Sequence, residues 1–298
     1  MNAMDKGLEI LKYKYSYEQV IENHLGGVLY NFYKEEEYKP IWKRQWFHND
    51  ILKSELESLG PLFKAQSIRP IVVKGVALLY DLYEDMGSRN MSDCDILVSP
   101  KEFTQTRELL ILQGYKVMKT SKWFANDFKC ELSKVINGRE VNFEVHSKLL
   151  FHHDYETWNI TALTEDFDTL EEKDHIIYMC AHLASSHSFL KLFWLFDIYF
   201  LSQKMEFDYD QLTLRAKELR VLNSLKMCFF CIDKFFMPKR SLSFTSLTYE
   251  YLFKVDFLWQ VKQSGLRYFL VKHLSKDSWI LAFKYDFFWL INKLSQKI

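Results

Sequence analysis

The sequence predicts an α+β protein in which a small mixed β-sheet lies between an N-terminal helical segment and a large C-terminal helical domain. Two observations carry this prediction. Short apolar and alternating runs, which are typical of strands, fall between residues 69 and 150. The second half of the chain has little glycine and a single proline, Pro238, as expected for long helices with short connections. We therefore divide the chain into residues 1–68, 69–150 and 151–298.

The first elements follow from local patterns. Residues 1 to about 68 are predicted to be helical, with breaks near Gly26-Gly27 and Pro40. Ile71–Val73 is a short β-branched run suited to a buried strand. The elements predicted next are a helix over Val76–Tyr83, a polar loop over Asp85–Met91 and a second strand over Cys94–Val98.

The helix after the second strand has marked ends. Ser99 is the expected N-cap, Pro100 takes the first helical position, and Glu102 completes a capping box. Gly114 ends the helix in the left-handed conformation that glycine favours. Tyr115–Lys119 is the next predicted strand.

A β-hairpin is predicted over Phe128–Ile136 and Arg139–His146, because these runs flank Asn137-Gly138. The second strand alternates between an apolar and a polar side. Its apolar side carries Val141, Phe143 and Val145, and its polar side carries Asn142, Glu144 and His146. From about Asp154 onward the pattern predicts helix to the end.

Three carboxylates are the candidate catalytic and metal-binding groups. Asp93 and Asp95 are two residues apart in a strand, so they share one face, where their charges repel unless a divalent cation holds them. Glu144 would join them as a metal ligand or a base if the hairpin lies beside their strand. Otherwise Glu144 is a solvent-exposed strand residue.

Three further residues are candidates for binding a nucleotide. Gly75 follows an apolar run and opens a helix, where backbone N–H groups can approach a phosphate. Lys74 can neutralise triphosphate charge, or simply extend from a strand end into water. Arg89 can hold phosphate with its two-pronged guanidinium, or form an ion pair that orders the loop or orients the carboxylates.

These residues carry a resemblance to a known family. The motifs are Lys74-Gly75, Tyr83, Arg89, Asp93-Cys94-Asp95-Ile96-Leu97-Val98, Gly114-Tyr115 and Val141-Asn142-Phe143-Glu144-Val145-His146. They resemble the nucleotidyltransferase-like proteins of the polymerase-beta superfamily, in particular a bacterial group labelled "uncharacterised nucleotidyltransferase". The resemblance covers residues 70–150 and extends more weakly to His182 and to the helix containing Asp197.

The resemblance implies a fold and an activity. It implies a small mixed sheet with helices, two Mg²⁺ ions (or Mn²⁺), and transfer of a nucleoside monophosphate from a nucleoside triphosphate to an unidentified acceptor with loss of pyrophosphate. Members of that group are associated with surface polysaccharide or peptide natural-product genes. The chain departs from the superfamily in having one glycine after the first strand, and Glu144 where aspartate is usual.

Composition excludes some classes of protein. Lys plus Arg and Asp plus Glu both number 39, so the net charge is zero, which disfavours a strongly electrostatic nucleic-acid binder. The most apolar stretches, Ser188–Leu201 and Ser278–Asn292, contain lysine and aspartate and indicate buried amphipathic helices, with peripheral membrane contact left open. The 5 cysteines without a regular framework, and the polar start of the chain, favour a reducing cytoplasm.

Other candidate sites have simpler interpretations. Cys228-x-x-Cys231 has no second pair and is interpreted as two buried thiols. His146 is expected to orient a neighbour through a hydrogen bond, because Mg²⁺ prefers oxygen ligands. His152-His153 fits a solvated turn, and His182 and His187, five residues apart, do not align on an α-helix face.

Two alternatives to an active nucleotidyltransferase remain open. The first is a non-catalytic nucleotide-binding module, which the single glycine and the long gap between Gly75 and Asp93 favour. The second is a toxin-like transferase that modifies tRNA or protein, for which the zero net charge disfavours the tRNA version.

Overall fold

The computed structural model describes residues 16–118, 129–150, 152–189, 192–204, 208–236, 247–253 and 265–295. The chain forms two compact units. The helical unit comprises Met1–Lys43, Gly87–Asn90 and Glu172–Ala282, and the sheet unit comprises Arg44–Met86, Met91–Glu171 and Phe283–Ile298. The three-segment division made from the sequence stays a prediction.

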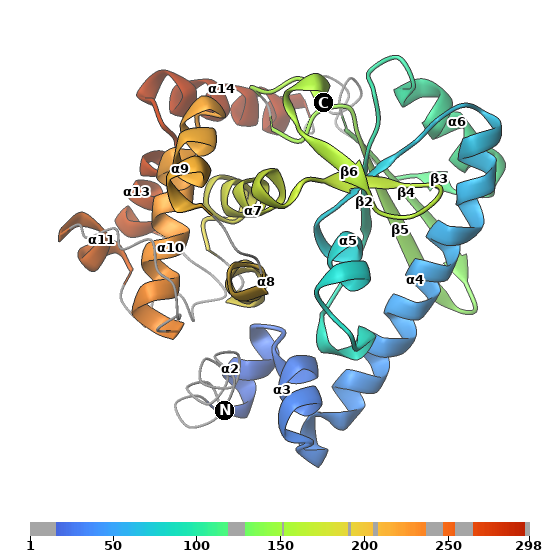
Figure 1. The fold of residues 1–298 in the computed structure, drawn as a ribbon, viewed down its shortest axis with the longest axis horizontal. Helices are drawn as coiled ribbons and strands as arrows, with labels where there is room; N and C mark the ends of the chain where they lie inside the picture. Colours follow the sequence, from blue (N-terminus) through green and yellow to red (C-terminus); the bar gives the residue numbers. More distant parts are fainter. Residues whose placement is uncertain are drawn as a thin grey trace. The chain divides into compact units, whose positions relative to one another are not determined.

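The sheet unit contains a seven-stranded mixed sheet of order β3-β4-β5-β2-β1-β7-β6 (Figure 1). Its strands are β1 (Ile71–Val73), β2 (Cys94–Leu97), β3 (Lys116–Val117), β4 (Lys129–Ile136), β5 (Arg139–His146), β6 (Ile160–Ala162) and β7 (Asp168–Leu170). β5 runs parallel to β2, and β1 runs parallel to β7, while the other neighbouring pairs are antiparallel. The predicted α+β class with a mixed sheet and a helical part is confirmed.

One face of the sheet belongs to a continuous hydrophobic core. Side chains alternate along each strand, so β2 and β5 direct their apolar residues to the same face. These residues include Cys94, Ile96, Val141, Phe143 and Val145, all of which are fully buried. Buried residues of α4 (Lys39–Ala65), α5 (Lys74–Asp81) and α6 (Phe103–Leu112) complete the same cluster (Figure 1). The opposite face of β2 and β5 carries the polar residues Asp95, Asn142, Glu144 and His146, together with the buried Leu97.

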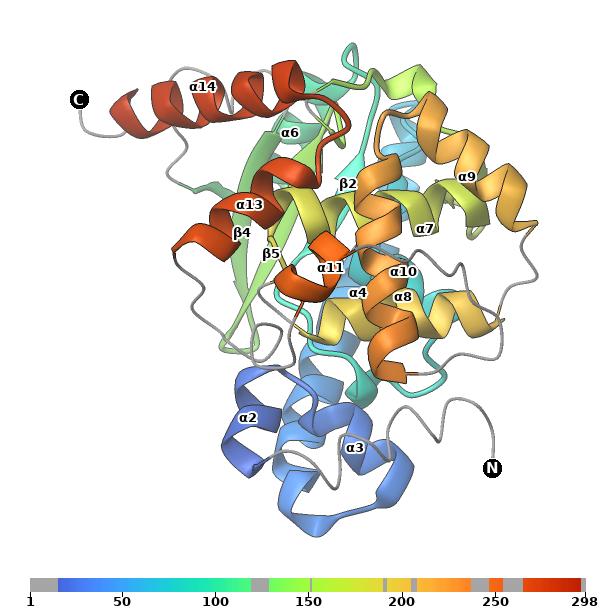
Figure 2. The same cartoon turned by 90° about the vertical axis from the view of Figure 1, so that its left-hand side faces the viewer.

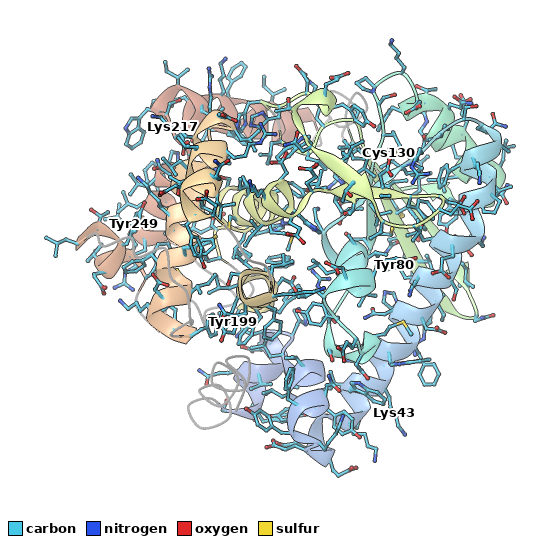
Figure 3. The ribbon with its side chains drawn as sticks, in the orientation of Figure 1. Lys43, Tyr80, Cys130, Tyr199, Lys217 and Tyr249 are labelled. Carbon is cyan, nitrogen blue, oxygen red and sulfur yellow. The ribbon has the colours of Figure 1, made fainter. Side chains whose placement is uncertain are left out.

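A hydrogen bond joins α5 to α4 at the surface of this core. Tyr80 on α5, which Figure 3 labels, donates its hydroxyl to Glu57 on α4 at 2.9 Å. The ammonium of Lys53, one turn earlier on α4, lies 4.3 Å from the centre of the Tyr80 ring. The long helix α4 therefore contacts α5 through polar groups as well as through the buried cluster.

The hairpin is confirmed at its predicted position. β4 and β5 pair antiparallel from Ile136↔Arg139 outward, and Asn137 and Gly138 both have left-handed backbones, with φ of 50° and 74°. Two consecutive positive φ values are characteristic of a type I′ turn, whose twist matches that of the strands. The turn chemistry therefore fixes the register along both strands.

The predicted helix after β2 starts later than its capping box indicates. Glu102 Oε2 accepts hydrogen bonds from the backbone N–H of Ser99 at 3.2 Å and from its hydroxyl at 2.7 Å. These contacts close a turn that precedes the helix, which begins at Phe103. Gly114 has a φ of 89°, as expected for a left-handed residue after a helix.

The helical unit is built from helices that lie far apart in the sequence (Figure 2). They are α2 (Tyr17–Glu22), α3 (Gly26–Tyr33), α7 (Glu172–Ala181), the π-helical turn η4 (His182–Ser186), α8 (Leu192–Lys204), α9 (Tyr209–Glu218), α10 (Leu222–Phe236), α11 (Leu247–Leu252) and α13 (Leu266–Leu274). The last helix, α14 (Trp279–Ser295), begins in this unit and continues in the sheet unit. Aromatic pairs fill the core, such as Tyr199 stacked on Phe236 with ring centres 4.9 Å apart (Figure 3).

The prediction of helix from about Asp154 onward is wrong where β6 and β7 form. β7 pairs with β1 through Ile71↔Asp168, and the Thr169 hydroxyl donates to the Val72 carbonyl at 2.9 Å. Three-residue strands are too short to show an alternating pattern. Their stability comes from the pairing of β7 with β1, which lies much earlier in the sequence.

The N-terminal breaks also differ in detail from the prediction. Gly26 and Gly27 begin α3, and Pro40 is the second residue of α4, where its missing N–H costs no hydrogen bond. Residues 1–15, and the predicted strand ends at Lys119 and Phe128, lie outside the described residues. Among the described helices, none combines the length and apolarity needed to cross a bilayer.

Candidate functional site

The candidate site lies on the polar face of β2 and β5. These strands pair in parallel with Asp95 opposite Glu144 and Leu97 opposite His146. Residues directly opposite each other direct their side chains to the same face, so the two carboxylates are neighbours. The condition set by the sequence, that the hairpin strand lies beside the strand bearing Asp95, is therefore met.

His146 contacts both carboxylates. Its Nε2 lies 3.0 Å from Asp95 Oδ1 and 3.1 Å from Glu144 Oε2. One ligand atom from each of the three residues lies within 4.8 Å of the others. The expectation that His146 orients its neighbours agrees with these contacts, and the structure also makes its imidazole a member of the donor cluster.

Two lysines neutralise the carboxylates. Lys74 Nζ lies 2.6 Å from Asp95 Oδ1 and 3.9 Å from Glu144 Oε2. Lys129 Nζ lies 2.5 Å from Glu144 Oε1 and 3.1 Å from Glu131 Oε1. Asp95 and Glu144 therefore each have a lysine as a cationic partner.

The electrostatics of Glu144 and His146 are coupled. Burial raises the pKa of Glu144, but the His146 hydrogen bond and the positive charges of His146, Lys74 and Lys129 outweigh it, so the pKa is well below its ordinary value. Burial lowers the pKa of His146, but the hydrogen bonds to Asp95 and Glu144 outweigh this effect, so the pKa lies above its ordinary value. The two residues thus favour an imidazolium–carboxylate pair.

Asp93 has a different environment. It precedes β2, is half-buried, and accepts a hydrogen bond from the Ser92 hydroxyl at 3.1 Å. Burial, and then repulsion from Asp95 and Glu144, raise its pKa to about 6, against the opposing effect of Lys74. Asp93 is not one of the three residues in the donor cluster, but its pKa responds to two of them.

Gly75 lies in the first turn of α5, directly after Lys74. The N-cap of α5 is Val73, whose side chain makes no capping hydrogen bond. A helix N-terminus without a side-chain cap leaves first-turn N–H groups suited to an anion such as phosphate. The polypeptide enters α5 through Lys74, whose φ of 56° is unusual for a residue with a Cβ.

Arg89 makes the ion pair that the sequence left open as its alternative role. It lies in the helical unit, where its Nε is 3.0 Å from Asp197 Oδ1 and its Nη2 is 2.7 Å from Asp197 Oδ2. Both residues are buried, and the Arg89 guanidinium also lies 5.5 Å from the centre of the Phe193 ring. The proposed phosphate-binding role of Arg89 stays a prediction.

Lys129 was missed by reasoning from the sequence. Its signal was available, because counting outward from the Asn137-Gly138 turn places Lys129 opposite His146 and Glu131 opposite Glu144. The hairpin register therefore predicts a lysine on the polar face beside the carboxylates.

The chemistry of the donor set fits a divalent cation. Two carboxylates and one imidazole converge within 4.8 Å, and Asp93 adds a third carboxylate whose ionisation the others oppose. A divalent cation would relieve this repulsion. Oxygen donors suit Mg²⁺, whereas an added imidazole suits metals such as Mn²⁺, Co²⁺ or Zn²⁺ better.

Comparison with protein families identifies a family for this chain. A family model described as "Uncharacterised nucleotidyltransferase" matches residues 35–237, more than half of the 298-residue chain. The matched region contains the sheet site and extends through α10. A search of the curated proteins found no match.

Proposed function

Because the chain belongs to the family described as Uncharacterised nucleotidyltransferase, we propose that it transfers a nucleoside monophosphate from a nucleoside triphosphate to an acceptor, with a divalent cation at Asp95 and Glu144. The observation that supports this most is the parallel register of β2 and β5, which sets these two carboxylates side by side with His146. Asp93, at the entry to β2, would complete the acidic set.

Three carboxylates and one histidine would form the cation site. Asp95, Glu144 and Asp93 would hold the cation, with His146 as a fourth donor or as the group that orients Asp95 and Glu144. A bound Mg²⁺ or Mn²⁺ supplies charge stabilisation to the phosphoryl group in transfer.

Lys74 would move its charge from Asp95 to the triphosphate once a cation compensates the carboxylates. Its Nζ is already between Asp95 and Glu144, at 2.6 Å and 3.9 Å, so a small displacement would free it. In the first turn of α5, at Gly75, backbone N–H groups that no side chain caps would donate hydrogen bonds to a phosphate oxygen. Catalysis would then consist of positioning and electrostatics, with no covalent intermediate on the protein.

A non-catalytic nucleotide-binding module is the second candidate. The observation that favours it is the charge balance of the site, because Lys74 and Lys129 compensate Asp95 and Glu144 without any metal. Such a module would bind nucleotide without releasing pyrophosphate.

Calorimetric titration of each nucleoside triphosphate, with Mg²⁺, with Mn²⁺ and with EDTA, tests the proposal. Binding is expected only with metal, and Asp95→Asn and Glu144→Gln should abolish it. Glu140→Gln is the matched control, because Glu140 is an exposed carboxylate on the same strand as Glu144. Equal affinity in EDTA would overturn the metal-bridged site.

A pyrophosphate-release assay separates the two candidates. Slow release in the presence of metal and nucleotide, lost in Asp95→Asn, would support a transferase that uses water in place of its acceptor. Metal-dependent binding without any release would support the binding module instead.

A further inference from the structure

The helical unit contains a histidine pair created by a π-helical turn. α7 ends at Ala181 and continues as η4, His182–Ser186, in which the His187 N–H donates to the His182 carbonyl at 3.2 Å. In a π-helix each backbone N–H bonds to the carbonyl five residues earlier, so residues five apart lie closer to one face than they do in an α-helix. His182 and His187, which an α-helix would direct apart, therefore point to the same side, and their Nε2 atoms lie 3.1 Å apart.

This separation matches the spacing of two ligands on one metal ion. Metal–imidazole bonds of about 2.0–2.1 Å, meeting at a square or tetrahedral angle, place the two nitrogens about 2.9–3.4 Å apart. The two rings are inclined by 61°, with their centres 4.4 Å apart.

The turn that carries the pair is fixed by its surroundings. The Ser185 hydroxyl lies 3.0 Å from the Ser224 hydroxyl on α10, and Lys276 Nζ donates to the Ser185 carbonyl at 3.3 Å. Ser188 and Phe189, directly after the pair, have φ of 48° and 62°, although neither is glycine. Such a backbone is strained for a residue with a Cβ and persists only where the surrounding structure imposes it.

Trp194 on α8 holds both imidazole rings in place. Its ring centre is 4.2 Å from that of His187 and 5.9 Å from that of His182, which it meets edge-on. All three side chains are half-buried, so the rings are held while solvent still reaches the group. A pair that is ordered before binding loses little entropy when it chelates a ligand.

We propose that His182 and His187 form a chelating site for a divalent transition metal, bound through both Nε2 atoms. The imidazole donors select Zn²⁺, Ni²⁺, Co²⁺ or Cu²⁺ over Mg²⁺, and water or an exogenous ligand completes the coordination. The site shares no residue with the cluster of Asp95, Glu144 and His146, so it is a second candidate metal site, of different chemistry, among the residues that the structure describes.

Titration of the full chain with Ni²⁺ tests this site. The His146→Ala background is used, because it weakens the other cluster. In that background, His182→Ala and His187→Ala should each lower Ni²⁺ affinity strongly. Loss of an outer-shell partner of a metal ligand lowers affinity about 10–100-fold, and loss of a ligand itself should lower it at least as much. The matched control is His152→Ala, since His152 is another half-buried histidine, with its ring centre 4.1 Å from that of His153. It should leave the affinity unchanged.

A second variant separates a metal site from a hydrogen-bonded pair. His187→Gln keeps a polar group that can bond to His182 Nε2 but removes the imidazole ligand, so Ni²⁺ affinity should fall as in His187→Ala while the melting temperature is kept. Electron paramagnetic resonance of Cu²⁺ bound to the His146→Ala protein should show two imidazole nitrogens. Unchanged Ni²⁺ affinity in the pair variants, or fewer than two nitrogens, would overturn the proposal.

The test is independent of the proposed transferase activity. Binding of a nucleoside triphosphate with Mg²⁺ depends on Asp95 and Glu144, and His187→Gln is expected to leave it unchanged. A failure of the histidine site and a failure of the nucleotide site are therefore seen in different titrations.

Discussion

Lys74 and Asp95 form the shortest contact between the start of α5 and the carboxylates, with Lys74 Nζ 2.6 Å from Asp95 Oδ1. Lys74 reaches this position from a left-handed backbone, with a φ of 56°. A lysine in this conformation costs on the order of 1–3 kcal/mol, which the buried ion pair and its hydrogen bond help to offset. The strained backbone and the charged side chain therefore both belong to the site.

Lys74→Met is expected to lower stability and nucleotide affinity together. Asp95 would lose a charged hydrogen bond, which contributes about 1.5–3 kcal/mol, and the triphosphate would lose its cation. Urea denaturation and calorimetry measure the two effects. The pKa of Asp93 should rise further, because Lys74 lowers it in the intact site.

Lys148→Met provides the matched control for the ion pair. Lys148 pairs with Asp154 at 2.5 Å, but the carboxylate is largely exposed, so the loss should be within about 1 kcal/mol. Equal destabilisation by the two lysine substitutions would contradict a special role for Lys74.

Asp93→Asn is expected to stabilise the protein at neutral pH. The folded-state pKa of Asp93 is raised from its ordinary value of 3.8 to about 6, so the folded state holds the proton more tightly and wild-type stability falls as pH rises between these values. The asparagine variant avoids this loss, and should gain about 1–2 kcal/mol at pH 7, reduced by solvent screening of a half-buried group. Urea denaturation from about pH 3.5 to about pH 7.5, a range that brackets both pKa values, measures the gain.

The gain should disappear below about pH 4, where Asp93 is protonated in both states. A variant that is destabilised at pH 7 would show that Asp93 has a structural partner.

Arg89→Ala is expected to destabilise the helical unit by about 3–5 kcal/mol, because it removes the guanidinium that pairs with the buried carboxylate of Asp197. The double variant Arg89→Met with Asp197→Leu should recover most of that loss, since an apolar pair replaces the ion pair. Chemical denaturation of the wild type, the single variants Arg89→Met and Asp197→Leu, and the double variant measures the coupling. Unchanged stability with lost nucleotide binding would instead support the phosphate-binding role of Arg89.

His146→Ala is expected to change metal preference more than metal binding itself. Loss of the imidazole should weaken Mn²⁺ more than Mg²⁺, because Mg²⁺ depends on the carboxylate oxygens. In the wild-type protein the Mn²⁺ affinity should also rise with pH, since Nε2 must lose its proton before binding. The raised pKa of His146 moves this rise to a higher pH than for an ordinary imidazole. Glu144→Gln is the comparison, and should weaken both metals.

The sequence was informative where local chemistry decides the structure. Asn137-Gly138 predicts a type I′ turn because both residues accept positive φ, and the alternation along β5 then predicts which face carries Glu144. The pairing of β5 with β2 needed the structure, because residue spacing alone does not determine which strands become neighbours.

Features that depend on distant partners could not be predicted in this way. Asp197 lies more than a hundred residues after Arg89 in the sequence, and the two meet only when the helical unit folds. The π-helical turn at His182 has no strong local signal, because hydrogen bonds from α10 and Lys276 hold it. β6 and β7 are stabilised by the edge of β1 rather than by their own three residues.

The parallel register of β2 and β5 determines both which residues face the hydrophobic core and which face the candidate site. A slip by one residue would turn Asp95 toward the core and bring Ile96 to the polar side, at the cost of burying a charge. Ile96 and Val145, which are paired on the core-facing side of the same two strands, therefore help to set the separation of Asp95 and Glu144 on the other side. Substitutions in that apolar layer, although remote from any substrate, are a means of adjusting metal affinity without changing a single ligand.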